Sequence, residues 1–83
     1  MNRGLFNDES MIYDLNTFTQ SGTYLISATQ VDNAPESIAG NMYLTVLDFT
    51  YSSNTRTVQI LCIQNNFYFR TLGPSNWANW MKL

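Results

Sequence analysis

Few residues in this chain have side chains suited to catalysis. There is no histidine and one cysteine, and acidic residues are few. Asp14, Asp32 and Asp48 could act as a general acid and base only if folding brought two of them together, and their spacing does not predict this. Cys62 lies between two aliphatic residues with no histidine to activate it, so we expect a buried small hydrophobe. A non-enzymatic protein is therefore the expectation.

Metal binding is equally poorly supported by the sequence. Asp32, Asn33 and Glu36 could offer oxygen ligands to calcium, but the stretch lacks the spacing of an EF-hand loop. A single thiol without histidine cannot form a structural zinc site. We expect no metal and no cofactor.

The most suggestive chemistry is a group of aromatic and hydrogen-bonding residues in the last third of the chain. Tyr68, Arg70, Asn76 and Trp77 could together bind a glycan, since flat aromatic faces stack on sugar rings and amides and guanidinium groups bond to hydroxyls. The alternative is that the large aromatics serve the core, with Arg70 stacked on a tryptophan ring. On that interpretation Trp80 is a core residue, and Trp77, which follows the polar stretch GPSN, lies nearer the rim.

Length and composition limit the classes of protein. Eighty-three residues make one domain, and with one cysteine an internal disulfide is impossible, so we expect stabilisation by oligomerisation or by a longer chain. The net charge is −2 and only 12% of residues are charged, which argues against nucleic acid and against a polybasic membrane surface. No signal peptide and no membrane-inserting run is recognisable.

Alternating apolar residues between turn-forming stretches predict β-structure. We expect strands over residues 22–28, 41–51, 55–64 and 66–72. The connections YSSNTR and IQNNF are short, so the strands they join should pair antiparallel, with asparagine at positive φ. The expected fold is all-β: a small antiparallel meander or sandwich of about four to five strands.

Local patterns refine this expectation. A short helical turn is expected over 35–39, where Pro35 can occupy a first helical position. A bulge is expected near 47–48, where the apolar residues change face, and strand 55–64 should be central and covered on both faces. Asp14 and Asn16 are expected to form Asx turns, and Gly22 to permit a positive-φ corner before Tyr24.

Six short motifs occur in order along the chain. They are DLN and GTY within the stretch YDLNTFTQSGTYLIS, then NAP, TVQ, YFR and finally WANWMKL, and the stretch that contains them runs from residue 13 to residue 83. In this order and spacing the sequence resembles the pyocin-knob family of tail fibres and receptor-binding proteins of bacteriophages and phage-tail-like bacteriocins. The loop after DNAP has fewer glycines than the family pattern, and the stretch DFTYSSNTRT is longer. The matching structural positions include Asp14, Leu15, Asn16, Gly22, Tyr24, Asn33, Pro35, Gln59, Tyr68, Arg70, Trp77, Trp80 and Leu83.

The resemblance implies a small antiparallel β domain over residues 13–83, preceded by a linker or lead-in over residues 1–12. It implies a virion or extracellular location, a homotrimer in the full-length protein, and contacts with other fibre or baseplate chains. The implied function is host attachment, either by contact with a bacterial surface glycan or as a structural, trimerising spacer. It implies no catalytic residues. The alternative is a carbohydrate-binding module of a secreted or surface protein.

Overall fold

The computed structural model describes residues 2–6, 12–28, 30–35, 40–51, 54–73 and 76–83. Strands account for most of the described chain, and one 3-10 turn accompanies them. The elements are β1 (Asn2–Phe6), β2 (Tyr13–Asp14), η1 (Leu15–Thr17), β3 (Gly22–Ala28), β4 (Val31–Asp32), β5 (Gly40–Tyr51), β6 (Asn54–Ile63), β7 (Asn66–Leu72) and β8 (Met81–Lys82).

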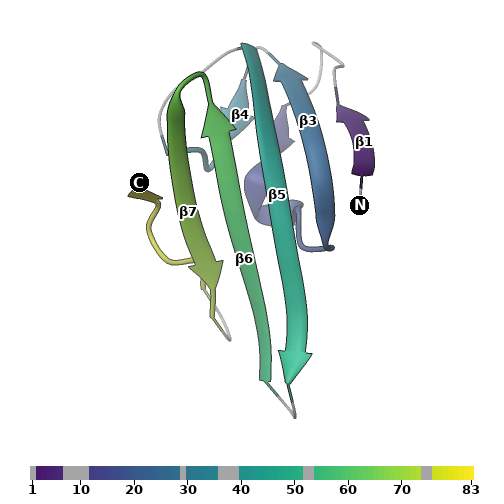
Figure 1. Cartoon of the computed structure of the whole chain (residues 1–83), viewed down its shortest axis with the longest axis vertical. Helices are drawn as coiled ribbons and strands as arrows, with labels where there is room; N and C mark the ends of the chain where they lie inside the picture. The colour runs from purple at the N-terminus through teal and green to yellow at the C-terminus, as the bar shows by residue number, and fades with distance from the viewer. Residues whose placement is uncertain (1, 7–11, 29, 36–39, 52–53, 74–75) are drawn as a thin grey trace.

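Six strands form one sheet in the order β1-β3-β5-β6-β7-β8. From β3 to β8 every neighbouring pair is antiparallel, whereas β1 lies parallel to β3. The long β5–β6 hairpin extends beyond the other strands at one end of the sheet (Figure 1). The all-β class and the predicted hairpins are therefore confirmed.

The tight connection between β6 and β7 fixes their register. Ile63 pairs with Asn66, which leaves Gln64 and Asn65 as the turn. The positive φ in this turn, 54°, belongs to Gln64 rather than to an asparagine as expected. Asn33 does adopt positive φ, 61°, after β4, and Gly22 has a φ of 154° at the start of β3, as predicted for that corner.

A small second layer covers one face of the sheet. It contains the parallel pair β2–β4 and the turn η1, and Figure 1 shows β4 and η1 behind the large sheet. We call the sheet face toward this layer the inner face and the opposite one the outer face. The core lies between the layers and contains Tyr13, Leu15, Phe18 and Val31 from the small layer with Tyr24, Ile26, Met42, Leu44, Val46, Leu61, Ile63 and Tyr68 from the sheet.

Several expectations about strand number and direction need correction. The main sheet has six strands and the small sheet two, more than the four to five predicted, and two pairs are parallel. Residues 2–6, expected as part of a lead-in, form the edge strand β1. The helical turn expected over 35–39 falls mostly outside the described residues, and the helical turn that the structure does describe is η1.

Two further corrections concern the outer face. The β5–β6 register runs without a shift through Leu47 and Asp48, so the expected bulge is wrong. Strand β6 is central, but only its inner face is covered by the small layer. Cys62 accordingly lies on the outer face and is only partly buried, rather than fully buried as expected. Apolar residues change face along β5 because both sheet faces are apolar, not because the strand bends.

Candidate functional site

A buried arginine organises the inner face near the end of β7. Arg70 is directly opposite Gln59 on β6, and its side chain is 5% exposed. Its Nε–H donates to Gln59 Oε1 at 2.9 Å. The amide nitrogen of Gln59 donates in turn to the carbonyls of Leu15 at 2.6 Å and Phe18 at 3.0 Å. This buried relay links β7 and β6 to the turn η1 of the covering layer.

Two tryptophan rings contact the same guanidinium group. The Arg70 Cζ lies 4.1 Å from the centroid of Trp77 and 4.4 Å from that of Trp80, both within cation–π range. Residues 78–80 are outside regular strands, which lets two rings three positions apart reach one side. Stacking therefore involves both rings, where the sequence suggested one.

Backbone hydrogen bonds fix the segment that carries these rings. Ala78 N–H donates to the Thr71 carbonyl at 2.8 Å, and Trp77 forms an isolated bridge with Leu72. Trp80 Nε1–H donates to the Asn33 carbonyl at 2.7 Å, across to the small layer. Trp80 is half-buried and packs against the core, so its prediction as a core residue is only partly right; Trp77 is half-buried as well.

Asp14 organises the opposite wall. Its Oδ1 accepts from the Asn16 backbone N–H at 2.9 Å and from the Asn33 side-chain amide at 2.7 Å. The first bond is the Asx turn predicted at Asp14, and it caps η1. The second joins β2 to the positive-φ residue that follows β4. The carboxylate thus acts as a structural acceptor.

These elements surround a pocket of about 460 Å³. Within the described chain, two buried polar atoms of its lining residues have no hydrogen-bond partner: Arg70 Nη2, a donor, and Asn16 Oδ1, an acceptor. The lining residues are Asn16, Asn33, Ala34, Arg70, Asn76, Trp77, Ala78, Asn79 and Trp80.

Burial sets the electrostatics of the pocket. Desolvation lowers the pKa of Arg70 to about 10, and the nearby Asp14 carboxylate opposes this shift. The guanidinium therefore remains protonated at neutral pH. The described lining has amide, guanidinium, indole and methyl groups but no carboxylate, thiol or hydroxyl. The indole rings can stack on a ligand, and the amide and guanidinium groups can form hydrogen bonds with it. None of these described groups can act as a general base or a nucleophile.

The structure brings together three of the four predicted glycan-binding residues. Arg70, Asn76 and Trp77 line the pocket, whereas Tyr68, 6% exposed, belongs to the core. Among the structural signature residues, Asn16 and Trp80 line the pocket and Asp14 supports its wall. Pro35 adjoins lining residue Ala34, while Gly22 and Tyr24 lie on β3 away from it.

Of the three aspartates considered for catalysis, Asp14 and Asp32 are brought together as paired residues of β2 and β4, whereas Asp48 lies on β5 in the large sheet. Each carboxylate accepts a local hydrogen bond: Asp14 Oδ1 from Asn16 and Asn33, Asp32 Oδ1 from Gln30, and Asp48 Oδ1 from Thr57. In the part of the chain that the structure describes, no three metal-ligating side chains cluster; Glu36 lies outside it.

A second pocket of about 280 Å³ lies beside Phe6, Phe18 and Tyr24.

Sequence reasoning missed six residues that line the pocket: Asn16, Asn33, Ala34, Ala78, Asn79 and Trp80. Asn16 had been expected to form an Asx turn and Asn33 had been considered as a calcium ligand, and it is the parallel pairing of β2 with β4 that places them side by side. Within the described ranges, no helix has the length and hydropathy of a membrane span.

Comparison with known proteins gives no match, whether to a family model, to a curated protein or to a solved structure.

Proposed function

We propose that this chain is a non-enzymatic knob module of a phage or phage-like tail fibre or receptor-binding protein, and that it contributes to host attachment by holding a surface glycan in the Arg70 pocket. The single observation that carries the glycan contact is the pocket itself. Two indole rings stack there on a buried guanidinium group, and Asn16, Asn33 and Asn76 line the same pocket.

The lining matches the chemistry of a sugar. Pyranose rings present C–H faces that pack on indole, and hydroxyls that both donate to and accept from amides. Arg70 contacts the face of each ring, so a sugar would pack on the ring surface that remains exposed. Arg70 and Asn16, two of the lining residues, also carry a buried donor, Nη2, and a buried acceptor, Oδ1, without hydrogen-bond partners. The volume falls within the range of small-ligand sites, about 300–1,000 Å³.

The location on a tail fibre rests on the resemblance of the motif order, in particular the segments around Asp14, Arg70 and the two tryptophans. A carbohydrate-binding module of a secreted protein would use the same pocket chemistry. The gene neighbourhood distinguishes the two, because structural tail genes accompany a fibre, whereas a glycoside hydrolase in the same reading frame accompanies a binding module.

The test is binding of the purified chain to an array of bacterial surface glycans, with Trp77→Ala as the site variant. Loss of the ring contact should weaken binding about tenfold, the equivalent of about 1.4 kcal/mol, while the variant stays folded. Ile12→Ala is the control, because Ile12 is 56% exposed and does not line the pocket. A parent chain that binds no glycan, or a Trp77→Ala variant that binds as well as the parent, would refute the proposed contact.

A further inference from the structure

The outer face of the large sheet carries a continuous apolar row across five strands. Side chains of directly paired residues in neighbouring strands lie on the same face. The pairings Leu5 with Leu25, Leu25 with Tyr43, Tyr43 with Cys62 and Cys62 with Phe67 therefore form one row from β1 to β7. No polar side chain interrupts it.

A second row runs beside the first. Thr45 pairs with Ile60, Ile60 with Phe69 and Phe69 with Met81 on β8. Leu47 and Val58 extend the apolar surface one step further along the same hairpin. The described small layer lies entirely behind the sheet, so no described strand or helix covers these rows (Figure 1).

The exposed area is large for a domain of this size. Leu5, Tyr43, Leu47, Phe67 and Met81 are 46–59% exposed. With roughly 200 Å² for a fully exposed large side chain, these five alone contribute on the order of 500 Å². This is already in the range of the largest apolar patch on a monomer, about 300–600 Å², before the half-buried residues between them are added. The total approaches the roughly 800 Å² per partner of a stable interface.

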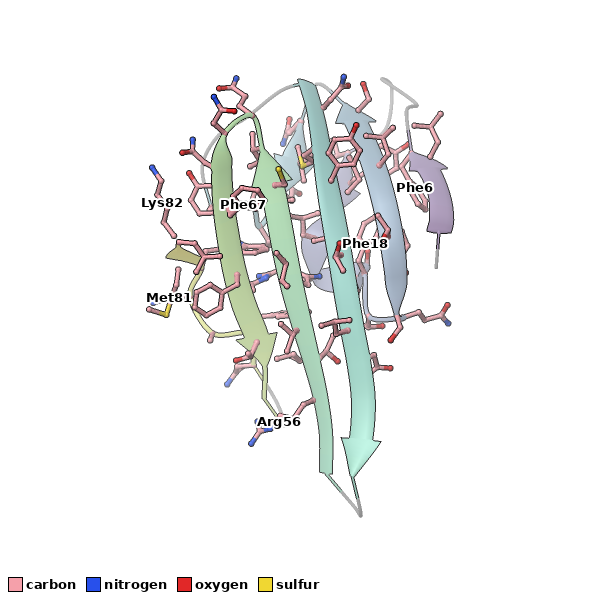
Figure 2. The ribbon with its side chains drawn as sticks, in the orientation of Figure 1. Phe6, Phe18, Arg56, Phe67, Met81 and Lys82 are labelled. Atoms are coloured by element: carbon pink, nitrogen blue, oxygen red, sulfur yellow. The ribbon has the colours of Figure 1, made fainter. Side chains whose placement is uncertain are left out.

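Charge is nearly absent from this surface. Among the described side chains of the outer face, Arg56 is the one charged group. Figure 2 shows it toward the end of the sheet where the β5–β6 hairpin extends, well away from Phe67. A surface without fixed charges meets no like-charge repulsion from an identical copy, and offers no complementarity to a strongly charged partner. Two flat sheet faces can pack about 10 Å apart with interdigitated side chains, as in a β-sandwich.

We propose that the outer face is a self-association surface, and that its occupant is the outer face of a second copy of this chain. Burial of the outer face adds stability that the small core does not supply. A domain of this size is only marginally stable alone, and its single cysteine cannot form an internal disulfide. The inference does not depend on the glycan proposal, because Arg70 and the pocket lie on the inner side of the sheet.

The first test is sedimentation velocity of the chain from about 1 µM to about 1 mM, the range of weak to moderate dissociation constants. We expect the mass to rise with concentration. Phe67→Asp, and independently Tyr43→Asp in the same row, should raise the dissociation constant roughly thirtyfold or more, the effect of losing one hot-spot side chain. Ile12→Asp is the matched control, since Ile12 is as exposed as Tyr43 but precedes β2 in the covering layer.

The second test needs no substitution. Cys62 lies in the middle of the first row, so its rate of labelling by a maleimide should fall as the protein concentration rises through the association range. A chain that stays monomeric at about 1 mM would overturn the proposal. So would association that Phe67→Asp and Tyr43→Asp leave unchanged, that Ile12→Asp weakens equally, or that leaves the labelling rate of Cys62 constant.

Discussion

Replacing Trp80 by alanine should remove most of the stability of the domain. The ring packs against the core, so most of its roughly 200 Å² is withdrawn from water, worth about 3.5 kcal/mol. Its Nε1–H bond to the Asn33 carbonyl adds about 1 kcal/mol, and its contact with Arg70 about 0.5 kcal/mol or more. The expected loss for Trp80→Ala is therefore about 5 kcal/mol.

This loss compares with a total stability of about 4–8 kcal/mol for a chain of this length. Urea denaturation followed by circular dichroism is the assay. With an m-value of about 1 kcal/mol/M, the midpoint should fall by about 5 M, which leaves Trp80→Ala largely unfolded. Trp80→Phe keeps much of the ring but loses the N–H, so it should cost less than half as much.

Trp77→Ala provides the comparison. Trp77 makes the same kind of contact with Arg70 but is not among the residues that pack against the core, so its loss should cost about 1–2 kcal/mol. The reasoning would be refuted if Trp80→Ala were as stable as the parent, or if the two alanine variants lost equal stability. Either result would mean that the segment after β7 is a surface rather than a closing element.

Two further predictions concern the hydrogen bonds that support the pocket. Gln59→Leu should cost about 3 kcal/mol in urea denaturation, because it leaves buried Arg70 Nε–H and the carbonyls of Leu15 and Phe18 without their partner; a loss below about 1 kcal/mol would contradict the relay. Asp14→Ala should cost about 1–2 kcal/mol by thermal denaturation, and Asp14→Asn less than half of that, because an amide oxygen still accepts the capping bonds. Equal losses in the two Asp14 variants would show that its charge matters more than its geometry.

The four long strands could be predicted from the sequence because each has its own local signal. Alternating apolar residues bounded by turn residues predicted strands 22–28 and 66–72 with the same ends as in the structure. The ends of the other two predicted strands, 41–51 and 55–64, differ from those of β5 and β6 by at most one residue. The β6–β7 turn holds its φ of 54° at Gln64 because the register, fixed by the flanking strands, determines the backbone there.

The remaining strands carry no such signal. β2, β4 and β8 have two residues each, too short for any periodicity. β1 and β2 pair in parallel with segments well along the chain, and parallel pairing has no turn motif to mark it. The lack of a sequence signal for β2 and β4 also explains why site residues were missed. Asn16 and Asn33 line the same pocket as Arg70 only because β2 and β4 pair over the inner face.

The exposed apolar outer face was not predicted from the sequence. Apolar residues on both faces of a strand usually indicate burial on two sides, and β6 was interpreted that way, whereas the change of face along β5 was interpreted as a bulge. In one copy of the chain only the inner face is covered, by the small layer behind the sheet (Figure 1). In the proposed pairing, the outer face that carries Tyr43, Ile60 and Phe67 is covered by a second copy, so β5, β6 and β7 are buried on one face by their own chain and on the other by the partner. The apolar residues on both faces of these strands are consistent with that proposal.

The positions of the two proposed surfaces have a consequence for attachment. Copies that pack through their outer faces leave each Arg70 pocket on the opposite side of its sheet, directed away from the contact. The two pockets of such a pair face in opposite directions, so one flat glycan-coated surface can engage only one of them, and pairing adds no avidity there. Phe67→Asp should therefore leave unchanged both the binding to immobilised glycans and the affinity for a soluble monovalent glycan. Trp77→Ala, in contrast, should weaken both, because it alters each pocket itself.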